Sequence, residues 1–391
     1  MSRAAMSEDA WEHLAIEHLA ELGWQPKAGA QIVPGSGERE SWDELLIPSR
    51  LRAKMRELNP SVPREYIDQA LAMIVAPTSQ DAIAENYRIH RFLTEGFRGL
   101  TYIDDSGQEQ TPTIRLVSAE ANENDWLAVN QVTIVKGDYE RRFDIVLYLN
   151  GMPVSIIELK QAGKKNADVA AAHAQLQTYL REFPLAFRFA VVVLASDGIT
   201  ARYGTPFTPL HHFAPWNVTD EGALASSDAV TAEDTALDRA LYWLYNPDRF
   251  GELMRGLVAF DEGDDGLTKR IAKPHQYFAV TKAVEKTIQA VETNGKAGVV
   301  WHTQGSGKSM EMELYANQVL RHPKLRNPTI VVVTDRNDID GQLYKTFKVS
   351  QLLPEAPKQV HRREELRAEL SGRASGGIYF TTLQKFGRSK A

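Results

Sequence analysis

An apolar stretch that runs directly into a glycine-rich loop is the feature that most constrains the fold of this chain. Residues 298–309 are GVVWHTQGSGKS, and the helix-like stretch MEMELYANQVL follows at 310–320. A strand, a glycine-rich loop and a helix in this order form the phosphate-binding turn of parallel α/β domains, because the N–H groups at the start of the helix face an anion. The sequence therefore predicts a strand at 298–301 that leads into a nucleotide site.

The residue types in this loop suit a nucleotide and its metal ion. Glycines let the backbone approach a phosphate, Lys308 can reach the β- and γ-phosphates, and the Ser309 hydroxyl can ligate Mg²⁺. His302 stands where the common pattern G-x-x-x-x-G-K-[ST] has its first glycine. We predict ATP and Mg²⁺ as cofactors, and the predicted contacts are Thr303, Gly305, Ser306, Gly307, Lys308 and Ser309.

The chain beyond residue 268 has the alternation of a parallel sheet. Apolar strands are expected at 329–334 and 377–381, with helical segments between them. Thr334, Asp335 and Arg336 come at the carboxyl end of the first of these strands, where open α/β sheets make their ligand contacts.

The residues before 220 predict a mixed sheet with helices on its flanks. Hydrophobic periodicity indicates helices at 7–24, 80–95 and 168–182. Strands are expected at 111–118, 130–136, 143–149, 154–159 and 189–195.

Two changes of composition mark the expected domain boundaries. Residues 217–235 are small and polar, and residues 261–267 are acidic and glycine-rich. A chain of 391 residues is also too long for one ordinary core. We therefore expect domains at 1–220 and 268–391, joined by a helical or linker segment at 221–267.

Three charged residues lie in two otherwise apolar strands of the first domain. The segment 143–160, FDIVLYLNGMPVSIIELK, carries Asp144 on one strand, and Glu158 and Lys160 on the next. Side chains alternate along a strand, so Glu158 and Lys160 share a face. Two carboxylates that hold Mg²⁺ beside an ammonium are what phosphodiester hydrolysis needs. We predict Asp144 and Glu158 as metal ligands, with Lys160 completing the catalytic set.

The pairing of these strands decides whether that site can form. A strict two-residue turn at Asn150-Gly151 pairs Asp144 with Ile157 and sends the two carboxylates to opposite faces. Pro153 cannot donate a ladder hydrogen bond, which favours an irregularity that shifts the register. We therefore predict a bulge or an odd loop. The alternative is a surface hairpin with a salt bridge between Glu158 and Lys160.

The order of the motifs resembles a known nuclease superfamily. Gln175 and Tyr179 stand one helical turn apart after the lysine, and Asp, Glu-x-Lys and Gln-x-x-x-Tyr in this order resemble the PD-(D/E)xK nucleases, in the RecB-like form of type I restriction subunits. This resemblance implies that Gln175 and Tyr179 orient the site or contact DNA, and that Glu17 of the opening helix points toward the metal. Phe143 replaces the proline of the superfamily's label.

The loop and its neighbours resemble a motor. The segment TQGSGKS at 303–309 is similar to motif I of superfamily 2 helicases, and KPHQYFAV at 273–280 resembles the helicase segment whose glutamine, here Gln276, contacts adenine. The segments VVVTDRNDIDGQL and YFTTLQKF look like the next motifs of type I restriction motors.

Together these resemblances imply the N-terminal part of a type I restriction subunit. The implied α/β fold is a restriction-endonuclease-like mixed sheet with flanking helices, followed by an incomplete RecA-like parallel α/β domain. The chain ends before the Asp-Glu motif of such motors, so we expect no ATP hydrolysis by it alone. The implied partners are double-stranded DNA and the modification and specificity subunits. A solitary helicase-nuclease of repair or phage defence, and an ATP-dependent remodeller without nuclease activity, remain open.

Composition limits the setting of this function. Formal net charge is −6, so DNA binding has to depend on local basic clusters. Cysteine is absent and no apolar stretch is long enough to span a bilayer, which predicts a cytoplasmic protein without disulfides or a membrane partner. The basic residues expected to contact phosphates near the carboxylates are Lys136, Arg141, Arg142, Lys164 and Lys165.

Overall fold

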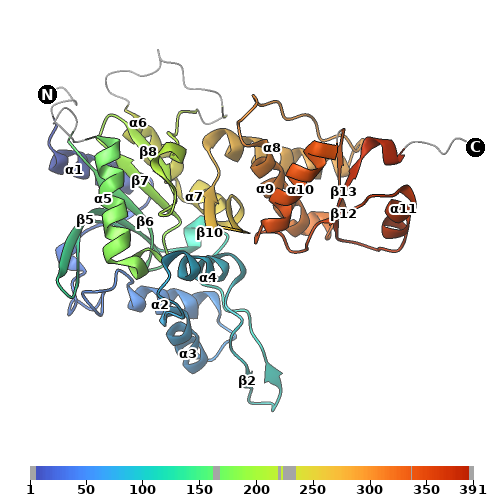
Figure 1. Cartoon of the computed structure of the whole chain (residues 1–391). Helices are drawn as coiled ribbons and strands as arrows, with labels where there is room; N and C mark the ends of the chain where they lie inside the picture. The colour runs from blue at the N-terminus through green and yellow to red at the C-terminus, as the bar shows by residue number, and fades with distance from the viewer. Residues whose placement is uncertain (1–5, 162–167, 219–221, 223–234, 336, 387–391) are drawn as a thin grey trace, which may run out of the picture. The chain divides into compact units, whose positions relative to one another are not determined.

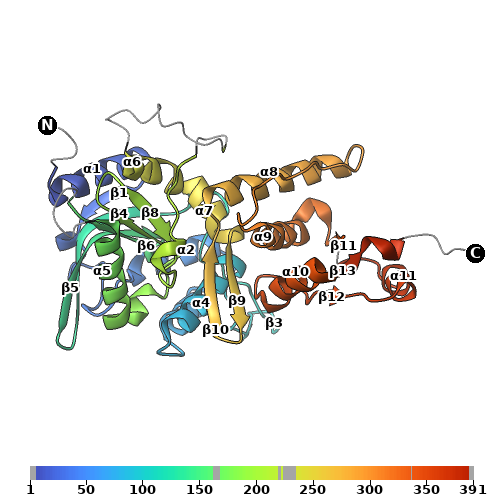
Figure 2. The same ribbon diagram turned by 45° about the horizontal axis from the view of Figure 1, so that its top comes forward.

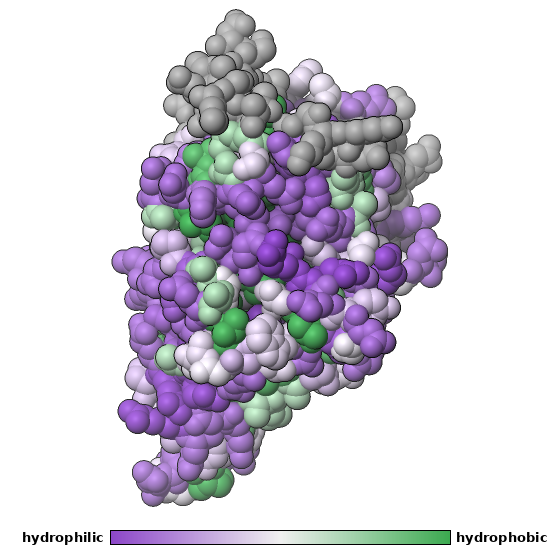
Figure 3. All heavy atoms as spheres, turned by 90° about the vertical axis from the view of Figure 1, so that its left-hand side faces the viewer, coloured by the Kyte–Doolittle hydropathy of each residue, from purple (hydrophilic) through white to green (hydrophobic). Residues whose placement is uncertain are grey.

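The chain divides into two units, residues 1–255 and 256–391, in a computed structural model. The structure describes residues 6–161, 168–218, 222, 235–335 and 337–386. None of the helices in these ranges combines the length and the hydropathy needed to cross a membrane. The face of the molecule in Figure 3 is largely hydrophilic, with apolar side chains only scattered over it.

A six-stranded mixed sheet organises the first unit, with the order β1-β4-β5-β6-β7-β8. β1 runs parallel to β4 and β6 parallel to β7, while the other neighbours are antiparallel. The expected mixed α/β sheet is thus confirmed. The strands are β1 (Gln25–Ala28), β4 (Trp126–Lys136), β5 (Tyr139–Leu149), β6 (Met152–Leu159), β7 (Val192–Ser196) and β8 (Ala201–Gly204).

Side-chain caps start the three helices that the sequence predicts. Ser7, Asp81 and Asp168 each accept a hydrogen bond from the N–H three residues on, which satisfies a donor that the helix itself leaves unpaired. The helices that follow these caps are α1 (Glu8–Glu21), α4 (Ala82–Glu95) and α5 (Val169–Glu182). The further helices of the unit are α2 (Pro48–Leu58), α3 (Arg64–Val75), α6 (Ala236–Arg239) and α7 (Pro247–Gly256).

The main core lies between α5 and the sheet (Figure 1). Leu176, Tyr179 and Phe183 of α5 are buried there with side chains of β4 to β7. The rings of Phe143 and Tyr179 meet edge to face at 4.6 Å. This packing anchors α5 beside the strands that carry Asp144 and Glu158.

The β5–β6 hairpin contains the predicted bulge. Asn150 (φ 53°) and Gly151 (φ 82°) form a tight turn of the left-handed type that hairpins favour. Tyr148 pairs with Pro153, but Leu147 pairs with Ser155, so one extra residue enters β6 between them. The register then continues to Ile145 opposite Ile157, and one step further it sets Asp144 opposite Glu158. The prediction of an irregularity near Pro153 is confirmed.

The strand expected at 111–118 is wrong. Only Ile114 forms a bridge, with Phe97, and the nearby two-residue strands are β2 (Tyr102–Ile103) and β3 (Glu109–Gln110). The Asn59 side chain takes the place of a neighbouring strand, since it accepts from the Arg115 N–H at 2.9 Å and donates to the Arg115 carbonyl at 2.8 Å.

A parallel three-stranded sheet, β11-β13-β12, forms the centre of the second unit. α8 and α9 pack against each other, and β9 and β10 form a hairpin (Figure 2). Residues 261–267 therefore belong to a hairpin and its turn. The elements are β9 (Val258–Gly263), β10 (Gly266–Ile271), α8 (Pro274–Val291), α9 (Lys308–Arg321), β11 (Ile330–Thr334), α10 (Asn337–Val349), β12 (Lys358–Gln359), α11 (Arg363–Ser371) and β13 (Ile378–Thr382).

The strand expected at 298–301 does not form, which corrects the sequence prediction. These residues pair with no strand in the ranges that the structure describes. Val299 and Trp301 are each 90% exposed. A strand needs a neighbouring strand for its backbone groups, and apolar alternation alone does not supply one.

The turn of the β5–β6 hairpin generates a stability prediction. An added Cβ at Gly151 would lie 2.4 Å from the Ile47 carbonyl oxygen, whereas one at Gly137 (φ 58°), in the β4–β5 turn, meets nothing within 4 Å. Gly137→Ala should cost about 1–2 kcal/mol for the left-handed backbone alone. Gly151→Ala should cost about 3 kcal/mol or more, because the clash adds to that strain. Urea unfolding of both variants measures the difference, and equal costs would contradict the packing of this turn.

Candidate functional site

Asp144 and Glu158 come together where β5 and β6 run side by side. Asp144 is 6% exposed and Glu158 is fully buried. The Leu159 N–H donates to Asp144 Oδ2 at 2.7 Å, which holds that carboxylate against the neighbouring strand. The structure therefore brings together the two carboxylates that the sequence predicts as metal ligands.

Lys160 completes this cluster. Its Nζ donates to Glu158 Oε1 at 2.6 Å and lies 3.6 Å from Glu8 Oε1 of α1. Its backbone N–H donates to the Ser196 carbonyl at 2.9 Å, so β7 fixes the end of β6. Burial acts against the charge, but the Glu158 carboxylate outweighs it and raises the pKa of Lys160. The ammonium is thus held protonated beside the carboxylates.

Burial raises the pKa values of both carboxyl groups. Burial raises the pKa of Asp144 from 3.8 to about 6, although the Leu159 N–H opposes the shift. Burial and the nearby Asp144 charge raise the pKa of Glu158 well above its ordinary value. Glu158 Oε2 is buried and has no hydrogen-bond partner among the described residues. An unsatisfied oxygen and two repelling carboxylates fit a hard divalent cation such as Mg²⁺.

Glu12 is a third acidic residue at this site, and the sequence analysis missed it. It is 3% exposed, whereas Glu17 is exposed to solvent, so Glu17 does not join the site. Burial raises the pKa of Glu12 to about 7; Gln131 opposes the shift, and the Asp144 charge adds to it. The helical period could have found it, because Glu12 lies within the stripe of Trp11, Ala15 and Leu19, and Glu17 lies roughly 140° away at 100° per residue.

An irregularity in β4 supports Glu12. Gln131 has φ 56° and lies opposite Asp144 in the β4–β5 register. Its Nε2 lies 2.6 and 2.5 Å from the two Glu12 oxygens. Since an added Cβ at Gly29 would lie 2.1 Å from the Gln131 carbonyl oxygen, only glycine fits there. The Gln131 side-chain amide thus holds the α1 carboxylate beside the cluster.

Gln175 and Tyr179 lie together on α5, as the sequence predicts. The Tyr179 hydroxyl accepts a hydrogen bond from the Gln175 amide and lies 3.3 Å from the Arg142 carbonyl oxygen, to which it donates. Burial raises the pKa of Tyr179, and the Glu158 and Asp144 charges reinforce the shift. Tyr179 therefore interacts electrostatically with both carboxylates, but no hydrogen bond joins it to them in the described residues. Its catalytic role stays a prediction.

A groove runs along β4 and β5 beside the cluster. Its volume is about 760 Å³, and Gln131 borders it. Arg142 also lines the groove, whereas Arg141 is engaged by Glu182 at 2.9 Å. Lys164 and Lys165 lie outside the described residues, as does Arg336. The remaining lining residues are Ala28, Gly29, Ala30, Val33, Trp42, Asn130, Thr133, Val135 and Glu140.

The glycine-rich loop in the second unit leads into α9 as expected. Gly305 (φ 82°) and Gly307 (φ 88°) are left-handed, and α9 begins at Lys308 with no side-chain cap. The first N–H groups of a helix without such a cap are available to an anion. Lys308 Nζ donates to the carbonyls of His302 at 3.1 Å and Thr303 at 2.8 Å. The loop therefore fits a phosphate group.

Gln276 supports the loop from behind. It is 3% exposed, and its Nε2 lies 3.3 Å from the carbonyl oxygens of both Ser306 and Gly307. Its Oε1 accepts from the Lys273 N–H at 2.8 Å. An added Cβ at Gly307 would lie 2.5 Å from that Nε2, so the loop needs glycine here. In this conformation the Gln276 amide is hydrogen-bonded to carbonyl oxygens of the loop. The contact of Gln276 with adenine stays a prediction.

Comparison with known proteins finds a family model that matches residues in each unit. A family model described as the type I restriction enzyme R protein N terminus matches residues 5–212, and one described as SWI2/SNF2 ATPase matches residues 275–391. The HindI endonuclease subunit of Haemophilus influenzae, a type I restriction enzyme, is 36% identical over 389 residues, which span 97% of this chain and 36% of that protein.

Two further relatives have the same description. The putative type I restriction enzyme MjaIXP endonuclease subunit of Methanocaldococcus jannaschii is 31% identical over 412 residues, with 98% of this chain and 38% of that protein covered. The SauCOLORF180P endonuclease subunit of Staphylococcus aureus is 26% identical over 272 residues, with 68% and 26% covered. The chain thus spans little more than a third of the first two relatives.

The buried carboxylates generate a pH prediction. A folded-state pKa raised from 3.8 to about 6 means that ionising Asp144 opposes folding. Wild type should therefore lose stability as pH rises through this window, and Asp144→Asn should not. The two proteins should be equally stable near pH 3.5, and the variant should be more stable at pH 7.5, by up to about 3 kcal/mol.

Unfolding by denaturant at several pH values measures this difference, with Asp138→Asn on the exposed β4–β5 turn as the control. Mg²⁺ at pH 7.5 should stabilise wild type and Asp138→Asn more than Asp144→Asn. A stability gap that does not change with pH would contradict the conclusion that burial raises the pKa of Asp144.

Proposed function

The chain belongs to the family of type I restriction enzyme R proteins, and from this premise we propose that it is the nuclease part of an endonuclease subunit joined to the ATP-binding start of its DNA motor. The observation that carries the proposal is the convergence of Asp144, Glu158 and Lys160 around a buried carboxylate oxygen that has no hydrogen-bond partner in the described part of the chain. The substrate is double-stranded DNA.

Different residues of the first unit would have different roles in phosphodiester hydrolysis. Asp144 and Glu158 would hold Mg²⁺, with Glu12 beside them on α1. When bound, the ion supplies a Lewis acid for the phosphate and lowers the pKa of a water molecule. Lys160 places a positive charge next to the carboxylates, where it can stabilise the charge that develops on the phosphate. The Leu159 N–H and Gln131 orient the acidic groups.

The second unit would bind ATP and Mg²⁺ through its glycine-rich loop. Lys308 would leave the carbonyls of the loop to reach the β- and γ-phosphates, and the Ser309 hydroxyl would hold the ion. The match to SWI2/SNF2 ATPases supports a motor that moves along DNA, with a RecA-like fold. We further propose that the subunit works in the cytoplasm with modification and specificity subunits, and that residues 1–220, 221–267 and 268–391 are its nuclease, connecting and motor regions.

Cleavage tests the first unit. In the full-length subunit assembled with its partner subunits, Glu158→Ala and Lys160→Ala should each lower cutting of plasmid DNA at least about a hundredfold. ATP hydrolysis should continue in both variants, because the phosphate loop is unchanged. Lys160→Arg should rescue poorly, since a planar guanidinium does not replace a compact ammonium. Asp138→Ala is the matched control. If Glu158→Ala cuts DNA at the wild-type rate, the nuclease assignment of this site is wrong and only the motor function remains proposed.

Nucleotide binding tests the second unit. A fluorescent ATP analogue should bind the 391-residue chain, and Lys308→Ala should weaken it at least about tenfold, since a charge-assisted contact to the phosphates is worth about 1.5–3 kcal/mol. Lys286→Ala, on the exposed side of α8, should bind like wild type. We expect no steady-state hydrolysis, because no Asp-Glu pair follows the loop in the sequence. Sustained phosphate release by the purified chain would refute that expectation.

A further inference from the structure

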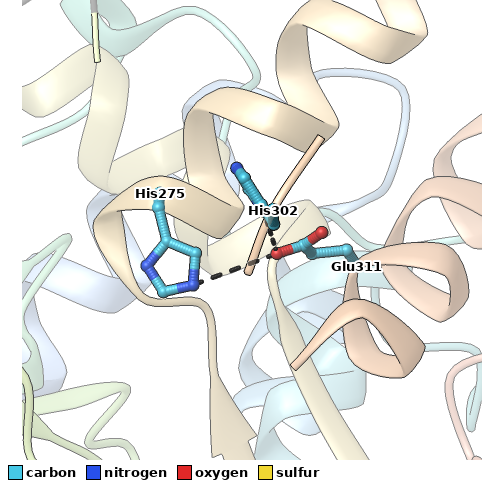
Figure 4. Close-up of side chains that lie close together, drawn as sticks. All are labelled: His275, His302 and Glu311. Atoms are coloured by element: carbon cyan, nitrogen blue, oxygen red, sulfur yellow. Dashed lines mark hydrogen bonds and ion pairs between the residues drawn. The ribbon is translucent and has the colours of Figure 1, made fainter. Parts of the chain in front are cut away.

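Two histidines and a glutamate converge beside the phosphate loop, and nothing in the proposed nucleotide chemistry uses them. His275 lies in the first turn of α8, His302 precedes the loop, and Glu311 lies in the first turn of α9 (Figure 4). In the described residues this is the one group of three His or acidic side chains whose ligand atoms all lie within 4.8 Å of one another.

The distances within this cluster are near those of a metal site. His302 Nδ1 lies 2.8 Å from Glu311 Oε1, and His275 Nε2 lies 3.9 Å from the same oxygen. Bond lengths of about 2.0–2.1 Å at a tetrahedral ion separate the ligand atoms by about 3.3 Å. Shifts below about 1 Å would therefore bring all three atoms to coordination distance.

The burial of Glu311 favours an ion over a solvated ion pair. Glu311 is 5% exposed, while the two imidazoles are partly exposed and border the loop. His275 Nε2 also lies 3.0 Å from the Ser306 carbonyl oxygen, and the Ser306 hydroxyl is buried without a partner among the described residues.

We propose that His275, His302 and Glu311 bind a zinc-class transition-metal ion. Two imidazole nitrogens and one carboxylate oxygen suit Zn²⁺, Co²⁺ or Ni²⁺, whereas Mg²⁺ prefers oxygen ligands. Three protein ligands leave a position for water or a phosphate oxygen. The ion would link three segments, because its ligands come from the start of α8, from the residue before the loop and from the start of α9.

Such an ion would act on the nucleotide site, a consequence that rests on the proposed function. The His302 carbonyl accepts from Lys308 Nζ, so the residue that would hold the ion also holds the lysine. An ion that fixes His302 stabilises the conformation in which Lys308 is bound to the loop's own carbonyls. Nucleotide has to displace Lys308 from them, so ion and nucleotide should oppose each other.

Metal binding to the 391-residue chain tests the site without any nucleotide. Glu158→Gln serves as the background, because it removes a ligand of the nuclease cluster. Titration with Co²⁺ should produce one equivalent with the intense visible absorption of a four-coordinate ion, and Zn²⁺ should displace it. His275→Ala and Glu311→Gln should each weaken Zn²⁺ at least tenfold, and His361→Ala and Glu364→Gln, both exposed in the same unit, should not.

Folding is checked by circular dichroism, and His275→Gln replaces His275→Ala if the alanine variant unfolds. Equal Zn²⁺ affinity in wild type and in folded variants of the cluster would overturn the proposal. So would the absence of binding at about 100 μM Zn²⁺, a concentration far above the dissociation constants of structural zinc sites.

A second measurement separates this proposal from the nucleotide proposal. Lys308→Ala should lose the ATP analogue and keep the Co²⁺ spectrum, while saturating Zn²⁺ should weaken the analogue for wild type but not for Glu311→Gln. If the analogue never binds, the nucleotide proposal fails and the metal proposal stands on its spectrum. If Zn²⁺ binds and leaves the analogue unchanged, the opposition between ion and nucleotide is wrong.

Discussion

Burial of two carboxylates that the sheet holds side by side is the constraint on which the rest of the first unit depends. Neither Asp144 nor Glu158 can move away, because the first is tied to the Leu159 N–H and the second lies within a fully buried strand. Burial in low dielectric makes both charges costly, and the Asp144 charge adds to that cost at Glu158. The cost of burying these charges is offset by the surrounding core, because the packing of α5 on β6 and β7 stabilises the strands.

Local departures from regular backbone place the functional side chains in both units. The extra residue in β6 sets Asp144 opposite Glu158, and the left-handed Gln131 in β4 reaches Glu12. In the second unit Gly305 and Gly307 bend the chain before α9. Regular strands and helices alone would leave these groups out of reach, so the irregular positions are the ones in which substitution should affect function before it affects the core.

Sequence predicted the features that depend on neighbours along the chain. Ser7 and Asp168 cap the starts of their helices, and Pro153 lies next to the bulge. Each of these residues affects only the backbone within a few positions of itself. The two wrong strand predictions depend on hydrogen-bond partners that lie far away in the sequence. Asn59 takes the backbone groups of Arg115, and residues 298–301 find no neighbouring strand in the described ranges. The choice of Glu17 over Glu12 is different, because the helical stripe of α1 already contained the answer.

The exposure of Trp301 gives the second unit an optical probe of its own. Four of the other tryptophans, Trp11, Trp24, Trp126 and Trp216, are at most 7% exposed, whereas the Trp301 indole is 90% exposed and stands two residues before Thr303. A water-soluble quencher would therefore reach Trp301 well before those four, and Trp42 of the first unit, which is 43% exposed, would be quenched to a smaller extent. Burial of that indole by a ligand, by DNA or by another polypeptide would then be visible as lost quenching and a blue-shifted spectrum, without any label attached to the protein.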